Sequence, residues 1–183
     1  MRKTTQVISG PARGALAHVR AQEWPARWTP DKRYCVTTHF QNVPFIGLID
    51  DDAHSAHLFM RMLAANEGPS VCHYGDAETG MADLAEVLGN PKASWPDLLV
   101  VDLKSHSDAN LDFVRRHHAG LRQKGVTLVV MVPLHDGARR KTYIEAGAAA
   151  VFFRQPELTA YRQELTAITN FWADNGRLDA VGM

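Results

Sequence analysis

From residue 45 onward, short apolar runs alternate with amphipathic segments, and this alternation constrains the fold more than any other feature of the sequence. The apolar runs are typical of strands buried on both faces, while the segments between them repeat apolar residues at helical spacing. Alternation of this kind predicts a parallel sheet with helices on both faces, joined by right-handed crossovers. The expected strands are residues 45–49, 70–74, 98–103, 126–132 and 149–153. The expected helices are residues 53–66, 77–88, 111–121, 137–146 and 158–172.

The predicted α/β domain occupies residues 44–174, which is enough chain for one domain with a proper core. Residues 1–43 lie outside the alternation and are basic, since residues 1–40 carry seven Lys and Arg against two acids. We expect this segment to be an N-terminal arm or extension. Residues 175–183 are expected to form a short C-terminal tail.

The bulk charge and hydropathy exclude some classes of protein. Lysines plus arginines equal aspartates plus glutamates, and this neutral balance argues against a sequence-independent nucleic-acid binder, which needs a basic surface. No apolar run approaches the roughly 20 residues of a membrane span. The N-terminus is basic but lacks the apolar stretch of a secretory signal. We therefore expect a cytoplasmic protein with no nucleic-acid partner and no membrane span.

Acidic residues follow two of the expected strands. Asp50, Asp51 and Asp52 end the first strand, and Asp102 ends the third. In a doubly wound sheet of strand order 2-1-3-4-5 these two strands are neighbours, so Asp50, Asp51 and Asp102 converge at the carboxyl edge, where such sheets bind ligands. Three carboxylates in one crevice need a cation, and Mg²⁺ together with a nucleophilic carboxylate suits phosphoryl chemistry. Asp52 is expected to cap the first helix.

Three segments resemble the receiver domain of bacterial two-component response regulators, including the single-domain chemotaxis type. They are LIDDD (48–52), PDLLVVDLKSHSDANLDFV (96–114) and IEAGAAAVFFRQP (144–156). The resemblance covers residues 44–172. It implies the flavodoxin-like (βα)5 fold with strand order 2-1-3-4-5.

The resemblance also implies a role for each acid. Asp102 would accept a phosphoryl group from a histidine kinase or a histidine phosphotransfer protein. Asp50 and Asp51, with Asp102 and the backbone carbonyl of Lys104, would bind Mg²⁺.

The sequence departs from the family pattern at the positions that respond to phosphorylation. Val132 stands where the family has a Thr or Ser hydroxyl. Val151 stands where the family has a switch aromatic. Arg154 replaces a lysine and keeps its charge for a phosphate contact, with a longer, planar group. The acidic residues of the family's site are therefore present in this chain, whereas the residues that respond to phosphorylation in the family are replaced.

These patterns favour a stand-alone receiver-like response regulator, phosphorylated on Asp102 and acting by protein contact. About ten residues follow the last helix, so we expect no output domain and no enzyme activity beyond phosphorylation and dephosphorylation of Asp102 itself. The fourth helix, fifth strand and fifth helix are the expected surface for a downstream target or a homodimer.

Two alternatives remain open. The first is a pseudo-receiver that works without phosphorylation, as an adaptor or dimerising module. The second is a phosphatase of the haloacid dehalogenase type, whose Asp-x-Asp motif fits Asp50 and Asp52. In that family a Thr or Val stands where this chain has His54.

Overall fold

One five-stranded parallel sheet forms the centre of the molecule. The computed structural model describes residues 44–181, with side chains for residues 44–175, so the arm expected at 1–43 lies outside the described residues. The strand order is β2-β1-β3-β4-β5, and every neighbouring pair is parallel. This confirms the predicted doubly wound sheet. The strands are β1 (Ile46–Ile49), β2 (Val71–His73), β3 (Leu98–Val101), β4 (Thr127–Pro133) and β5 (Ala150–Arg154).

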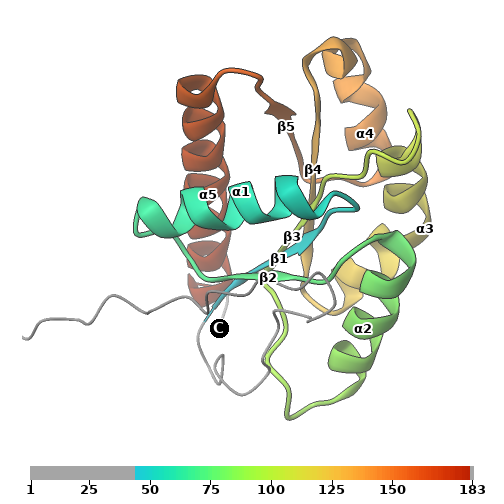
Figure 1. Ribbon diagram of the computed structural model, residues 1–183. Coiled ribbons are helices and arrows are strands. Elements are labelled where there is room, and N and C mark those ends of the chain that lie inside the picture. The colour runs from blue at the N-terminus through green and yellow to red at the C-terminus, as the bar shows by residue number, and fades with distance from the viewer. Residues whose placement is uncertain (1–43, 182–183) are drawn as a thin grey trace, which may run out of the picture.

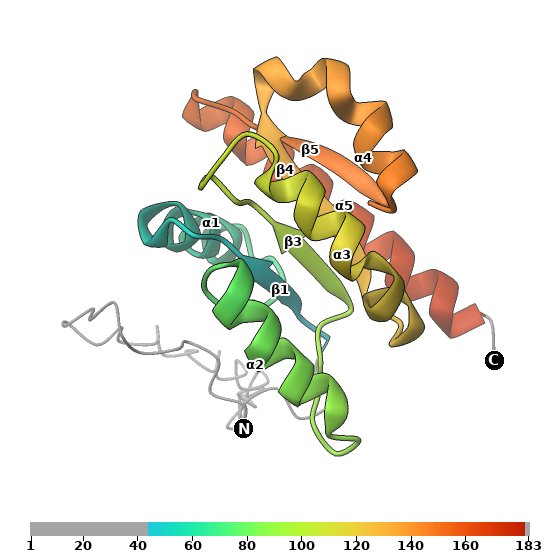
Figure 2. The same cartoon turned by 90° about the vertical axis from the view of Figure 1, so that its right-hand side faces the viewer.

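Helices cover both faces of this sheet. They are α1 (Ala53–Ala65), α2 (Ala77–Gly89), α3 (Ala109–Gln123), the 3-10 helix η1 (Leu134–Arg139), α4 (Arg140–Ala146) and α5 (Leu158–Val181). Figure 1 shows α1 and α5 on one face and α2, α3 and α4 on the other. The turned view in Figure 2 shows the same division into three layers.

The sheet separates two hydrophobic clusters, because successive strand residues point to opposite faces. Val101 and Val130 belong to the cluster beneath α2, α3 and α4. Val100 and Val129 belong to the cluster beneath α1 and α5. All residues of β1 and β3 are buried, as expected for central strands covered on both sides. The carboxyl ends of these two strands are therefore held firmly by packing.

Two aspartates begin helices by capping them. The Asp52 carboxylate accepts hydrogen bonds from the amides of His54 and Ser55, at 2.9 and 3.3 Å, which confirms the predicted cap of α1. Asp76 caps α2 in the same way. Such caps satisfy amide groups that have no partner within the helix.

Gly147 ends α4 with a left-handed backbone, at φ 117°, a conformation that glycine adopts without steric cost. A β-carbon at this position would lie 2.4 Å from ring atoms of His118. Both the backbone conformation and the space therefore require glycine here.

The predicted fourth helix, at 137–146, is only partly right. Residues 134–139 form the tighter 3-10 helix η1 directly after β4, and the α-helix begins at Arg140. Short 3-10 segments of this kind are common at the N-termini of α-helices. The spacing of apolar residues alone does not distinguish a 3-10 helix from the first turns of an α-helix.

The last helix is longer than predicted. The apolar pattern ends near Trp172, but α5 continues to Val181, through most of the segment expected as a tail. The sequence after Trp172 does not continue the apolar repeat at helical spacing, so periodicity does not locate the end of this helix.

Candidate functional site

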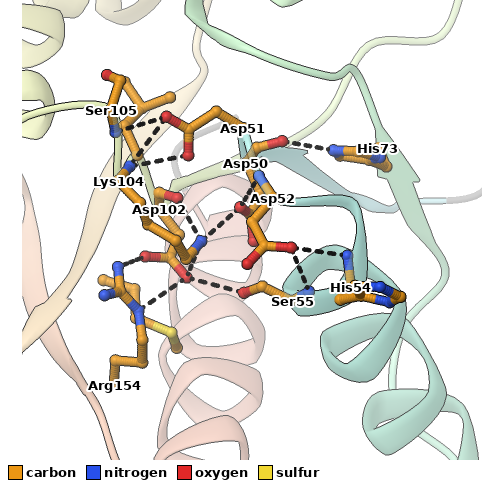
Figure 3. A network of polar contacts seen from close by, with 12 residues as sticks. Asp50, Asp51, Asp52, His54, Ser55, His73, Asp102, Lys104, Ser105 and Arg154 are labelled. Atoms are coloured by element: carbon orange, nitrogen blue, oxygen red, sulfur yellow. Dashed lines mark hydrogen bonds and ion pairs between the residues drawn. The ribbon is translucent and has the colours of Figure 1, made fainter. Parts of the chain in front are cut away.

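The candidate site lies at the carboxyl edge of β1, β3 and β5. β1 and β3 are neighbours in register, with Ile49 opposite Val101, so Asp50 and Asp102 follow the two strands side by side. The Asp102 amide donates to the Ile49 carbonyl at 2.9 Å, which extends the pairing to the acid itself. The structure thus brings Asp50 and Asp102 together, as the sequence predicts (Figure 3).

Asp102 is buried and shared between two cations. The Arg154 guanidinium, at the end of β5, forms an ion pair with Oδ1 and a longer Nε contact of 3.4 Å with Oδ2. The Lys104 ammonium lies 3.1 Å from Oδ2. Ser55 Oγ, in the first turn of α1, lies 3.5 Å from the same oxygen. Burial by itself would lower the pKa of Arg154, but the Asp102 carboxylate raises it overall, which keeps the guanidinium charged.

Asp50 is also buried, and its two oxygens differ. Oδ1 accepts from the Lys104 ammonium at 2.5 Å and from the Asp52 amide at 2.8 Å. Oδ2 has no hydrogen-bond partner among the described residues. Burial, followed by the nearby Asp102 charge, raises the pKa of Asp50. A buried carboxylate with an unpaired oxygen is costly and marks a place for a further ligand or a water molecule.

The side chains of Asp51 and Asp52 do not join the contacts between Asp50, Asp102 and the two cations. Asp51 turns to the loop after β3, where its carboxylate accepts from the amides of Lys104, at 2.8 and 3.0 Å, and Ser105, at 2.8 Å. Asp52 points to the start of α1 and serves as its cap. The cap uses Oδ1 of Asp52, and the phosphatase alternative that pairs Asp50 with Asp52 stays a prediction.

The two expected switch positions are apolar and buried. Val132 and Val151 lie on β4 and β5 in the cluster beneath α2, α3 and α4. Neither side chain has a polar atom with which to contact a phosphoryl group.

The acids in this arrangement do not fit a divalent cation. The Lys104 ammonium occupies the space between Asp50 and Asp102, and backbone amides already use both oxygens of Asp51. Among the residues that the structure describes, no group of three His, Cys, Asp or Glu side chains is placed to hold a metal ion. The Mg²⁺ ligands expected from the sequence therefore stay a prediction that requires Lys104 to move.

Sequence reasoning missed the side chain of Lys104 and the buried Asn110. Asn110, on α3, accepts from the Leu103 amide at 2.8 Å and donates to the carbonyls of Leu103 and Met131, at 3.3 and 3.2 Å. It therefore fixes the loop that carries Lys104. A lysine two residues after a predicted buried acid is a signal that could have suggested the ion pair.

Comparison with solved structures supports the fold. No protein-family model matches the chain, and no curated protein matches it by sequence. Among solved structures, the Mn²⁺-bound form of response regulator Rcp1 is 17% identical, with a TM-score of 0.58 over 70% of this chain and 94% of that one. The phosphorylated cyanobacterial phytochrome response regulator RcpA is 20% identical, with a TM-score of 0.59 over 72% and 94%.

A CheY-like receiver domain protein from Methanospirillum hungatei is 19% identical, with a TM-score of 0.55 over 74% of this chain and 98% of that one. This chain has the receiver fold. The fold expected from the resemblance is thus confirmed, and the receiver fold places Asp50, Asp102 and Arg154 at one edge of its sheet. No helix in residues 44–181 is both long enough and apolar enough to span a membrane.

Proposed function

We propose that this chain is a receiver-type signalling protein of a cytoplasmic two-component pathway. Asp102 accepts a phosphoryl group from a histidine kinase or a histidine phosphotransfer protein, and the phosphorylated chain acts by contacting a downstream protein. The observation that carries this proposal is the setting of Asp102, a buried carboxylate at the carboxyl edge that lies between the two cations Lys104 and Arg154. The chain catalyses nothing beyond its own phosphorylation and dephosphorylation.

The chemistry follows from those contacts. A carboxylate oxygen of Asp102 attacks the phosphorus of phosphohistidine, the P–N bond breaks, and the leaving imidazole takes up a proton. The product on Asp102 is an acyl phosphate. Arg154 and Lys104 already contact the two carboxylate oxygens of Asp102, one of which attacks, so their hydrogen bonds can pass to the oxygens of the incoming phosphoryl group. Mg²⁺ is the cation that the resemblance implies, but no step here depends on it.

The partner surface is also part of the proposal. Leu134 and Leu158, at the starts of η1 and α5, are about half exposed, and Ile144 of α4 is exposed to a similar degree. Three of the four large exposed apolar side chains in the described residues thus lie on elements next to β5. These side chains support a protein contact on the α4–β5–α5 surface, either with the target or with a second copy.

The test is intact-mass spectrometry after incubation with acetyl phosphate. We expect the parent protein to gain the mass of one phosphoryl group and Asp102→Asn to gain none. Asp112→Asn, an exposed aspartate on α3, is the matched control and should be labelled like the parent. A parent that gains no mass, or an Asp102→Asn variant that is labelled as well as the parent, would overturn the proposal.

A second candidate is an adaptor that binds its partner without phosphorylation. It is favoured by Lys104, which already pairs with both acids, and by Val132, which lacks the hydroxyl expected to respond to phosphate. This candidate predicts that Asp102→Asn, unlabelled in the assay above, binds the partner as tightly as the parent.

A further inference from the structure

The Lys104 ammonium is surrounded by oxygen atoms of two aspartates, as a bound cation would be. Its ammonium lies 2.5 Å from Asp50 Oδ1, 2.8 Å from the Asp102 carbonyl and 3.1 Å from Asp102 Oδ2. An ammonium has three N–H donors, and three oxygens lie in reach here. Both carboxylates are almost wholly buried, and the lysine side chain is 22% exposed. These contacts form a largely buried ion-pair site, unlike an ion pair between exposed surface side chains.

The backbone of the same residue is fixed independently. The Lys104 amide donates to both oxygens of Asp51, and the Ser105 amide donates to one of them. Residue 104 therefore touches three acids, one through its backbone and two through its side chain (Figure 3). This arrangement fixes where the side chain starts and directs it back over Asp50 and Asp102.

A divalent ion bound by Asp50 and Asp102 would have to share this space with the ammonium. Like charges so close together, in a site with little water, repel strongly. Arg154 adds a second positive charge on the other side of Asp102. Metal and ammonium therefore exclude one another.

We propose that the Lys104 ammonium is a built-in cation that takes the place of a divalent metal ion in this site. It neutralises Asp50 and Asp102 from within the chain, and a divalent ion binds only by displacing it. The inference rests on the proposed function for its assignment of the acids, but its test does not require phosphorylation.

The test measures Mn²⁺ binding to the full chain by the loss of the free-ion signal in electron paramagnetic resonance. Lys104→Met keeps the backbone amide and carbonyl and most of the length of the side chain while removing the charge. We expect Lys104→Met to bind Mn²⁺ at least about tenfold more tightly than the parent, a difference typical of removing one adjacent like charge. Lys124→Met, at the exposed end of α3, is the matched control and should behave like the parent. Equal Mn²⁺ affinity of parent and Lys104→Met would overturn the inference.

Thermal unfolding gives a second measurement of the same difference. Excess Mn²⁺ should raise the melting temperature of the parent by less than it raises that of Lys104→Met, because in the parent the ion must displace the ammonium, and equal rises would overturn the inference. Lys104→Gln replaces Lys104→Met if circular dichroism shows the latter to be unfolded. Acetyl phosphate labelling separates the two proposals: a parent that is not labelled ends the phosphorylation proposal, whereas the Mn²⁺ comparison decides the role of Lys104 either way.

Discussion

Asp102 shares its carboxylate between two cations that come from different parts of the chain. Arg154 arrives from the end of β5, and Lys104 lies two residues further along the loop from Asp102 itself. The sequence predicts where Asp50 and Asp102 lie, because strand order fixes which strand ends are neighbours. It does not predict the path of the Lys104 side chain, because that path depends on loop contacts made by Asp51 and Asn110.

Val132 provides a test at the scale of one residue. Val132→Thr has nearly the same shape but buries a hydroxyl in the apolar cluster where Val132 lies. We expect the free energy of unfolding to fall by about 1–3 kcal/mol, the cost of burying a hydroxyl without a partner. Urea unfolding measures this difference.

Thr127→Val, at the half-buried start of the same strand, is the control and should change stability by no more than about 0.5 kcal/mol. A Val132→Thr protein as stable as the parent would contradict this prediction.

At the scale of elements, the loops that follow the strands position the site, and capping residues fix where the helices begin. Asp52 and Asp76 cap α1 and α2, and Gly147 ends α4. Strands and caps are predictable because apolar runs and short polar side chains have local preferences. The η1 segment and the far end of α5 are not, since neither has a periodic apolar face that marks its limits.

Asp76 gives the test at this scale. Hydrogen bonds from the Thr79 amide, and then from its hydroxyl and the Glu78 amide, hold the pKa of Asp76 below its ordinary value of 3.8. The cap therefore stabilises the fold above pH 3.8, and this contribution is lost as the pH falls below that value towards the folded-state pKa. We expect Asp76→Ala to lower the free energy of unfolding by about 0.5–2 kcal/mol at neutral pH.

Urea unfolding at several pH values measures this effect, and the gap between parent and Asp76→Ala should narrow in acid. Glu86→Ala, on the exposed side of α2, is the control and should change the free energy of unfolding at neutral pH by no more than about 0.5 kcal/mol. A gap that widens in acid would contradict the assignment of the cap.

At the scale of the whole molecule, both hydrophobic clusters and all five strands lie between residues 44 and 181. The described residues thus contain a complete three-layer sandwich with its own core, the property expected of an independent domain. Alternation along the sequence predicts this architecture because each strand must be buried on both faces.

The corresponding prediction is that residues 44–183 fold without the first 43. We expect this fragment to keep the far-ultraviolet circular dichroism of an α/β protein and a single cooperative thermal transition. A fragment that melts without a transition would contradict the domain boundary at residue 44.

The length of α5 has a mechanical consequence. With 24 residues the helix is about 36 Å long, whereas the five residues of β5 span about 17 Å. α5 begins four residues after Arg154, close to the acidic edge, and runs back past the opposite edge of the sheet (Figure 2). Because the helix is long and stiff, a tilt of about 5° about its first turn moves its far end by about 3 Å. A change too small to disturb the packing around Asp102 can therefore become a displacement large enough to open or close a contact on the opposite side of the molecule.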